Sequence, residues 1–265
     1  MTQPVVPLAF SRPGEASPVA PPWVVLHGLM GRGRNWLHAA KALAARTEAP
    51  VWTLDLRNHG DSPHAAPMDY PSMAADVRAW LDAQLPDQPV RLIGHSMGGK
   101  VAMRLAVDRP DLVAQLVVID ITAGPVEPRW GPEFAAMAAL DLAGLPSRQA
   151  ADAALVEAIP HPSLRQFLLS NLERDRAAGG WRWKVNLPLI RASMDALFAA
   201  PLAEGEQFRG PTQWIRGGRS NFFAESEWPI VQAHFPTAQL FRVPDAGHNV
   251  HTDNLPGLLE VLAGA

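Results

Sequence analysis

Short apolar runs alternate with amphipathic segments over the first part of the chain. The runs have the length and aliphatic character of buried strands, and the segments between them repeat apolar residues at helical spacing. In one of these segments Met73, Val77 and Leu81 share a face. Strands joined by helices form a parallel sheet that is covered on both faces. The predicted strands are residues 23–26, 51–56, 90–93 and 116–119, and the predicted helices are residues 35–46, 72–85 and 97–108.

This alternation stops over residues 122–200, which contain helix-like segments and no convincing buried strand. It resumes with strands at 212–216 and 239–243 and helices at 225–234 and 255–262. A helical insertion that interrupts a parallel sheet is well placed to be a lid, although extra packing would give the same pattern. We therefore predict an α/β core of residues 1–121 and 201–265 and a helical cap of residues 122–200. The helix-like segments of the insertion are 133–140, 149–158, 163–174 and 189–199.

The opening of the chain is rich in proline, including Pro13 and Pro18. Because proline cannot serve a central strand, we expect one short edge strand there, at residues 8–12. The first ten residues lack a basic segment followed by an apolar stretch, so they do not resemble a secretory signal. No apolar run approaches the roughly 20 residues that cross a bilayer.

Composition excludes several classes of protein. The chain has 265 residues, of which 48% are hydrophobic, enough for a sizeable core. A net charge of −3 without basic runs argues against nucleic acid or an acidic membrane as a partner. The absence of cysteine excludes disulfides, a thiol nucleophile and cysteine-ligated metals. We expect a cytoplasmic protein that needs no cofactor and no metal.

The most informative motif is Gly94-His95-Ser96-Met97-Gly98, between a predicted strand and a predicted helix. Gly-x-Ser-x-Gly in this context is a nucleophile elbow, a strained turn that exposes the serine hydroxyl above the sheet edge. Glycine is needed on both sides because neighbouring backbone leaves no room for a Cβ. The motif predicts Ser96 as a nucleophile. An ordinary serine in a glycine-rich turn is the alternative.

A serine nucleophile needs a base, and His248 has the best position among the nine histidines. It follows the strand at 239–243 in a turn of small residues, and a helix begins soon afterwards. The last member of an elbow triad belongs at this carboxyl edge of the sheet. A loop histidine that caps the next helix is the alternative, and His251 is the reserve candidate for the base.

The acid of the triad is harder to assign. Its commonest place is the loop after the strand at 212–216, but Asn221 stands there and cannot carry the required charge. Asp120 ends an otherwise apolar strand, where a carboxylate is costly unless it has partners such as a histidine N–H. We therefore favour Asp120, although it could instead cap the start of the insertion. The other candidates are Glu225 and Asp195, and Asp245 is disfavoured because it lies close to His248 in sequence.

Two backbone N–H groups are predicted to form an oxyanion hole, which stabilises the charge that develops on a substrate oxygen. The first belongs to Met97, directly after the serine and at a helix N-terminus. The second belongs to Leu29, in the loop His27-Gly28-Leu29-Met30-Gly31 that follows the first buried strand. A glycine turn that only leads into the next helix is the alternative for this loop.

Together these residues resemble the α/β-hydrolase superfamily, and within it the small YbfF-like bacterial esterases and their mitochondrial relatives. The resemblance spans nearly the whole chain, including Trp181-Arg182-Trp183 in the insertion. It implies a cofactor-free serine hydrolase of carboxylic esters or thioesters, with the acid at Asp120. The motifs are HGLMG (27–31), LDLRNHGDSP (54–63), GHSMGGK (94–100), VIDI (118–121) and AGHNVH (246–251).

The chain departs from the pattern of this family at two positions. Asn249 stands where the family usually has tryptophan beside the catalytic histidine, which alters the expected pocket. Pro188 matches the position from which some relatives take an acid in the insertion, so that route is closed here.

Other functions fit the sequence less well or stay open beside this one. Residues 94–100 also fit the phosphate-binding loop Gly-x-x-x-x-Gly-Lys, but Val101 stands where the magnesium-binding hydroxyl belongs. A non-catalytic binding module of the same fold is a further alternative. Ser96 disfavours dehalogenase and epoxide hydrolase chemistry, which needs aspartate at the elbow. Hydrolysis of lactones, amides or C–C bonds and perhydrolysis stay open, and the apolar insertion suggests a small-molecule ester with an apolar acyl or alcohol group.

Overall fold

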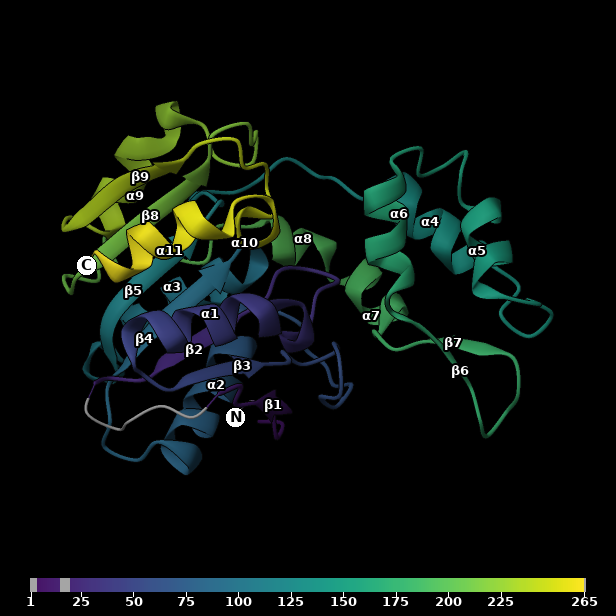
Figure 1. The fold of residues 1–265 in the computed structure, drawn as a ribbon, viewed down its shortest axis with the longest axis horizontal. Helices are drawn as coiled ribbons and strands as arrows, with labels where there is room; N and C mark the ends of the chain where they lie inside the picture. The colour runs from purple at the N-terminus through teal and green to yellow at the C-terminus, as the bar shows by residue number, and fades with distance from the viewer. Residues whose placement is uncertain (1–3, 15–19, 265) are drawn as a thin grey trace.

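The computed structural model describes residues 4–14 and 20–264. Its centre is a seven-stranded sheet in the order β1-β3-β2-β4-β5-β8-β9 (Figure 1). Every neighbouring pair is parallel except β1–β3 at the edge. The predicted, mostly parallel sheet is therefore confirmed. The strands are β1 (Phe10–Ser11), β2 (Trp23–Leu26), β3 (Val51–Leu54), β4 (Val90–His95), β5 (Val113–Ile119), β8 (Thr212–Gly217) and β9 (Ala238–Val243).

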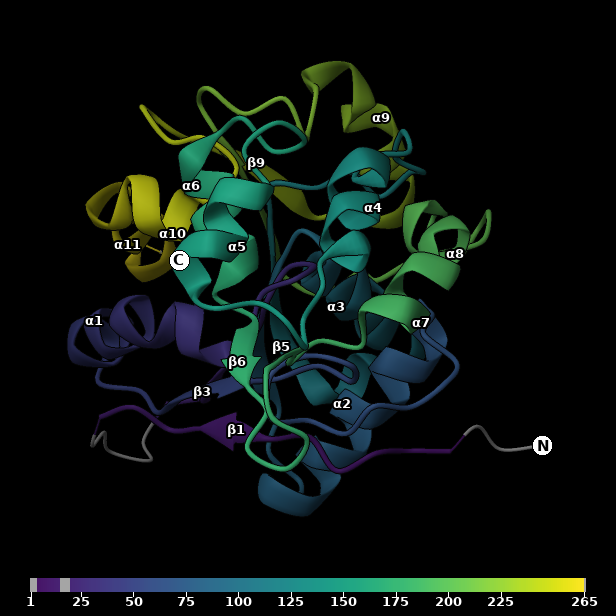
Figure 2. The same cartoon turned by 90° about the vertical axis from the view of Figure 1, so that its right-hand side faces the viewer.

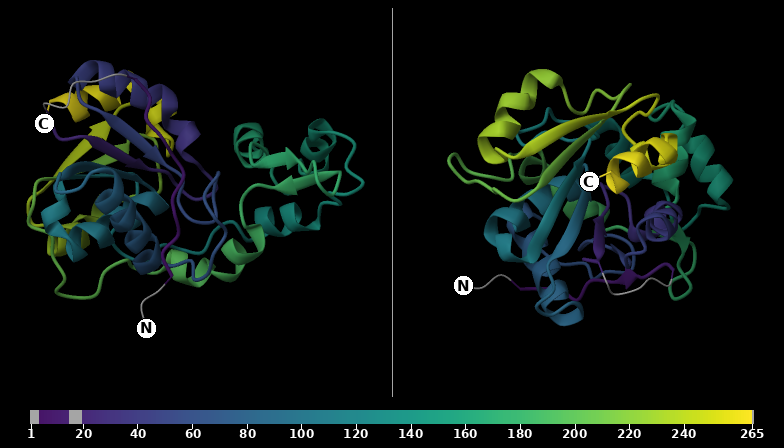
Figure 3. Two further views of the ribbon diagram at one scale, coloured as in Figure 1. Left: turned by 90° about the horizontal axis from the view of Figure 1, so that it is seen from below. Right: turned by 60° about the vertical axis from the view of Figure 1, so that its left-hand side comes forward.

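Helices cover both faces of the sheet, as Figure 3 shows. Alternate side chains of β2 point to opposite faces, since successive residues of a strand do so. Val24 and Leu26 join the buried cluster under α2 and α3, whereas Trp23 and Val25 join the cluster under α1 and α11. The helices of the core are α1 (Leu37–Thr47), α2 (Tyr70–Gln84), α3 (Met97–Asp108), α9 (Trp228–His234), α10 (Val250–Asp253) and α11 (Leu255–Ala263).

Most element bounds of the core agree with the pattern of the sequence. The predicted edge strand is present but holds two residues, and the strand predicted at 51–56 ends at Leu54. The short helix α10 was not predicted, since four residues carry too little periodicity. Pro18 of the opening segment and the outermost residues of the predicted core, 1–3 and 265, lie outside the described residues.

Between β5 and β8 the chain leaves the sheet. In Figure 1 the helices α4, α5 and α6 and a small hairpin stand beside the sheet, and α7 and α8 lead back to it. In Figure 2 the same elements face the viewer, in front of the sheet. These elements are α4 (Gly131–Ala139), α5 (Arg148–Ala154), α6 (Pro162–Leu169), β6 (Leu172–Arg174), β7 (Trp181–Trp183), α7 (Leu187–Ala192) and α8 (Met194–Phe198).

Two expectations for this segment were wrong. The helix predicted over 163–174 ends at Leu169, and the chain continues as β6, which pairs with β7. The indole N–H groups of Trp181 and Trp183 donate to the carbonyls of Leu145 and Met137, so tertiary contacts select a hairpin here. The helix predicted over 189–199 is two helices, because Ser193 leaves helical geometry between α7 and α8.

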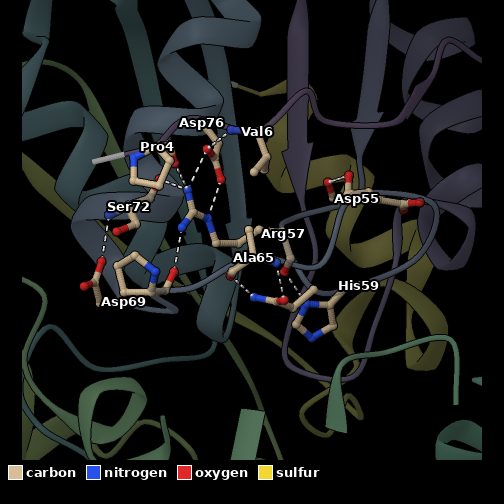
Figure 4. Close-up of polar contacts among 12 residues, drawn as sticks. Pro4, Val6, Asp55, Arg57, His59, Ala65, Asp69, Ser72 and Asp76 are labelled. Atoms are coloured by element: carbon tan, nitrogen blue, oxygen red, sulfur yellow. Dashed lines mark hydrogen bonds and ion pairs between the residues drawn. The ribbon is translucent and has the colours of Figure 1, made fainter. Parts of the chain in front are cut away.

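A buried ion pair fixes the loop after β3 (Figure 4). Arg57 and Asp76 are 0% and 1% exposed, and two guanidinium nitrogens lie 2.6 and 2.7 Å from the two carboxylate oxygens. The remaining guanidinium hydrogens reach backbone carbonyls, including that of Pro67 at 2.6 Å. Asp76 also accepts the N–H of Val6 at 2.9 Å. This network ties the loop to α2 and to the opening segment of the chain.

Replacing one member of this pair should destabilise the fold strongly. Arg57→Met leaves the Asp76 carboxylate buried without its counter-charge, which costs about 3–5 kcal/mol of unfolding free energy. Arg57→Met/Asp76→Leu should lose less than the single variant, because no charge stays buried. Urea unfolding measures both, with Arg109→Met as a control that removes an exposed ion pair and should change the unfolding free energy little. A single variant as stable as the wild type would contradict this account of the loop.

Candidate active site

The turn between β4 and α3 has the geometry of a nucleophile elbow. Ser96 has φ +52° and ψ −121°, a strained backbone conformation for a residue with a side chain. A Cβ on Gly94 would lie 2.3 Å from the Gly98 carbonyl oxygen, and one on Gly98 would lie 2.5 Å from the Leu26 carbonyl oxygen. Both flanking positions therefore require glycine, as the motif predicts. Ser96 is partly exposed and lines a cavity.

Asp120 and His248 meet at the carboxyl edge of the sheet. The Nδ1 atom of His248 lies 2.7 Å from Oδ2 of Asp120, which is fully buried at the end of β5. The other carboxylate oxygen, Oδ1, accepts the backbone N–H of Gly217 at 3.0 Å. The hydroxyl of Ser220 donates to Oδ2. The carboxylate thus has a donor from β8, from the loop after it and from the loop after β9.

Ser220 belongs to the loop in which the acid was expected, and Gly217 is the last residue of β8 directly before that loop. This part of the chain does not supply the carboxylate, but the end of β8 and the loop after it each supply a donor to the carboxylate of Asp120. Sequence reasoning did not find this role of Ser220. The available signal was a hydroxyl at the carboxyl end of the strand next to Asp120 in the sheet.

The other candidate acids lie apart from His248. Glu225 is 63% exposed and forms an ion pair with Arg216 at 2.9 Å. Asp195 is exposed on α8, and Asp245 is exposed in the loop before the histidine. Within residues 4–14 and 20–264, Asp120 is the carboxylate that contacts the His248 ring.

The imidazole of His248 contacts two other rings. Phe222 stacks on it with centroids 3.6 Å apart at 17°, and the ring of His95 lies 4.6 Å away. The Nε2–H of His95 also donates to the His248 carbonyl at 2.9 Å. Burial lowers the pKa of His95 well below its usual value, with the nearby imidazole of His248 as a further cause. A neutral His95 places no competing charge beside His248.

His251, the reserve candidate for the base, has a different position. It stacks on Trp36 with centroids 3.9 Å apart and lies 5.5 Å from the His95 ring. Burial lowers its pKa to about 4, and the positive charge of a protonated His248 would lower it further. Neither of its nitrogens contacts a carboxylate among the described residues. His251 therefore lacks the partner that a triad base requires.

Ser96 and His248 line the same cavity. Since Asp120 engages Nδ1 of the imidazole, Nε2 is the nitrogen that is free to exchange a proton. Within the described part of the chain, the Ser96 hydroxyl makes no hydrogen bond of 3.5 Å or less. The hydrogen bond between a catalytic serine and its base is often long before substrate binds, and it shortens in the substrate complex.

The two predicted oxyanion donors also border this cavity. Leu29 and Met97 line it beside Ser96, and in the described residues neither backbone N–H has a hydrogen-bond acceptor. Met97 is the first residue of α3, where backbone N–H groups lack partners within the helix. Both groups are therefore available to an oxygen atom bound above Ser96.

The loop that carries Leu29 is fixed from three directions. Met30, at φ +62°, donates its N–H to His59 Nε2 at 3.2 Å and accepts from the Asn171 amide at 2.8 Å. His27 Nε2 accepts the N–H of Leu56 at 3.0 Å, while its Nδ1–H donates to the Gly28 carbonyl at 2.8 Å. Neutral histidines are needed, because each ring must both donate and accept.

The cavity has a volume of about 630 Å³ and is mostly apolar. Its lining combines the carboxyl edge of the sheet with the segment between β5 and β8. Among the residues that the structure describes, no group of three or more candidate ligands could hold a metal ion. The apolar lining includes Ile121, Val126, Trp130, Leu164, Phe167 and Phe198.

Comparison with known proteins identifies the family. Residues 21–255 match the family model described as alpha/beta hydrolase fold. The chain belongs to the α/β-hydrolase family. It is 41% identical to the sn-1-specific diacylglycerol lipase ABHD11 of Mus musculus, over 88% of this chain and 76% of that protein. It is 33% identical to a putative esterase/lipase of Haemophilus influenzae, over 88% of this chain and 78% of that protein.

A solved structure is also similar over nearly the whole chain. It is described as a marine microorganism esterase and has a TM-score of 0.91 at 32% identity, covering 98% of this chain and 99% of that one. These relatives support an ester-hydrolysing member of the α/β-hydrolase family. None of the helices described here combines the length and apolar character that crossing a membrane requires.

The buried histidines of the loop should make the protein sensitive to acid. Burial lowers the pKa of His27 to about 4, and burial together with the nearby His27 lowers that of His59 to about 3. Unfolded histidine titrates near 6.5, so the unfolded chain binds more protons below that pH. The contribution to stability is complete above about pH 6.5 and is lost as the pH falls towards 4. We expect the unfolding free energy to fall by a few kcal/mol over this range.

His59→Gln should reduce this acid dependence, because the variant removes one buried proton site. Urea unfolding at pH 7 and pH 4.5 measures how much stability each variant loses in acid. The control is His38→Gln, because His38 is an exposed histidine on α1. The same loss of stability in wild type and His59→Gln would show that His59 is not held neutral in the fold.

Proposed function

We propose that this protein hydrolyses carboxylic esters, or thioesters of the same acyl groups, through the triad Ser96, Asp120 and His248. The observation that carries the proposal is the 2.7 Å contact between His248 and the buried Asp120, beside a strained serine at one cavity. Esterases and lipases among the relatives support the same chemistry. Other acyl bonds, such as those of lactones and amides, could use this machinery as well.

In the proposed first step, Nε2 of His248 takes the proton of the Ser96 hydroxyl, and Oγ attacks the ester carbonyl carbon. Asp120 holds the ring so that Nε2 faces the serine and stabilises the imidazolium that forms. The N–H groups of Leu29 and Met97 then stabilise the oxyanion.

Two further steps complete the reaction. His248 donates its proton to the departing alcohol or thiol, which leaves an acyl group on Ser96. Water, deprotonated by His248, attacks this ester, and the carboxylic acid is released with Ser96 restored. No cofactor or metal takes part in the proposed sequence.

We further propose that residues 122–200 act as the cap of this site, on a core of residues 1–121 and 201–265. Side chains from this segment, among them Val126, Trp130 and Phe167, line the same cavity as Ser96. An apolar wall of this kind fits an apolar acyl or alcohol group better than a charged one. The substrate class proposed is therefore a small-molecule ester with at least one apolar chain.

Asp120→Asn should lower kcat for a p-nitrophenyl ester by about 10³- to 10⁴-fold, because the amide favours the wrong tautomer of His248. The fold should survive, since an amide still accepts hydrogen bonds. Glu225→Gln is the matched control, since this carboxylate pairs with Arg216 instead, and it should keep wild-type turnover. Near-normal turnover of Asp120→Asn would refute its role as the acid.

A fluorophosphonate probe separates an esterase from a non-catalytic binding module. We expect the wild type to be labelled at Ser96 and Ser96→Ala to stay unlabelled, with hydrolysis reduced to the background left by binding and the oxyanion donors. Intact-mass measurement locates the adduct, and Ser163, another serine at the cavity, serves as the control through Ser163→Ala. A folded wild type that is not labelled would favour the binding module.

A further inference from the structure

The wall of the cavity contains a buried cation that the proposed reaction does not use. Lys100 lies one helical turn after Ser96 on α3 and is 1% exposed. Within residues 4–14 and 20–264 its ammonium forms no ion pair, and it donates to two backbone carbonyls. Burial lowers its pKa to about 8, although the charge of Glu227 opposes this shift. A buried ammonium is costly unless it is well hydrogen-bonded. The two carbonyls that accept from Lys100 therefore indicate what the residue does in the fold.

The two carbonyls belong to the two connections between the sheet and α4–α8. One connection, residues 121–126, leaves β5 and is called the outgoing limb, and the other, residues 197–201, is called the returning limb. Nζ of Lys100 lies 2.8 Å from the Gly124 oxygen and 2.8 Å from the Ala199 oxygen. The limbs run side by side, since the N–H of Val126 donates to the Phe198 carbonyl at 2.8 Å.

Besides Lys100, each neighbouring side chain holds one limb alone. The indole N–H of Trp214 on β8 donates to the Ile121 carbonyl of the outgoing limb at 3.0 Å. The hydroxyl of Tyr70 on α2 donates to the Leu197 carbonyl, and the guanidinium of Arg104 on α3 lies 3.4 Å from the Pro201 oxygen. Among the described residues, Lys100 is the side chain that donates to both limbs. It joins the outgoing and the returning connection to the helix that begins at Ser96.

The limbs also form part of the cavity wall. Val126 of the outgoing limb and Leu197 and Phe198 of the returning limb line the cavity, as does Lys100 itself. The spacing of the limbs therefore fixes how much room the cavity has beside Ser96.

We propose that Lys100 is a positioning residue that clasps both limbs onto α3 and so sets the width of the pocket for the apolar chain of the substrate. The part that concerns substrate choice depends on the function proposed above. The clasp itself does not depend on it, since it concerns contacts within the chain.

Lys100→Met tests the clasp by removing both hydrogen bonds while keeping an unbranched side chain. We expect hydrogen exchange of the Val126 amide to become at least about tenfold faster, because two buried carbonyls lose their donor and the limbs separate more often. Tyr70→Phe is the matched control, because it removes a donor to the returning limb alone, and it should change this rate by less than about threefold. Lys100→Gln, with a shorter donor, should lie between Lys100→Met and the wild type.

The enzymatic arm compares p-nitrophenyl acetate with the p-nitrophenyl ester of a longer acyl chain. In Lys100→Met the ratio of kcat/KM for the long and the short ester should change by at least about fivefold, mainly through KM. Labelling of Ser96 by a small fluorophosphonate should stay within about threefold of wild type, since the triad is intact. If Lys100→Met instead caused a general structural defect, kcat/KM for both esters and the labelling of Ser96 would all fall together.

Each failure has a separate meaning. A Val126 amide that exchanges equally fast in wild type and in folded Lys100→Met overturns the clasp. Faster exchange with an unchanged ester ratio overturns the role in substrate choice. If Lys100→Met does not fold, the exchange rate and ester ratio of Lys100→Gln decide, and wild-type values for both overturn the proposal. A wild type that neither hydrolyses esters nor reacts with the probe refutes the proposed function, while the exchange measurement still tests the clasp.

Discussion

The site depends on how one buried carboxylate is satisfied. Asp120 has no contact with solvent, so its charge must be balanced by hydrogen-bond donors from the protein. The donors come from Gly217, Ser220 and His248, which lie at or after the ends of β8 and β9. Satisfying this carboxylate therefore brings the ends of three strands to one point and fixes the imidazole next to the elbow serine.

A second constraint acts on the opposite side of the site. The loop that carries Leu29 is held by His59 from the loop after β3, and that loop is fixed in turn by the buried ion pair of Arg57. Asn171, which lies between α6 and β6, donates to the same loop through the Met30 carbonyl. The segment between β5 and β8 is thus linked by a hydrogen bond to the loop of the proposed oxyanion donor Leu29, and it also forms part of the cavity wall.

The sequence alone predicted the sheet, its helices and the elbow, because these depend on local patterns: apolar periodicity and two glycines that backbone contacts require. It also selected Asp120 over Glu225 and Asp195, since a carboxylate at the end of a buried strand needs partners. It could not find the roles of Ser220, Phe222 or His95, because each depends on loops that meet only in the folded chain. The β6–β7 hairpin was missed for the same reason, since tertiary contacts of its tryptophans outweigh helix propensity.

Trapping the acyl-enzyme tests the central claim most directly. The wild type is mixed with excess p-nitrophenyl ester and quenched in acid within the first turnover, and its peptides are mapped by mass spectrometry. The account predicts the mass of one acyl group on the peptide that contains Ser96. An acyl group on another residue, or ester hydrolysis that proceeds with Ser96 unmodified under conditions that accumulate the intermediate, would contradict it.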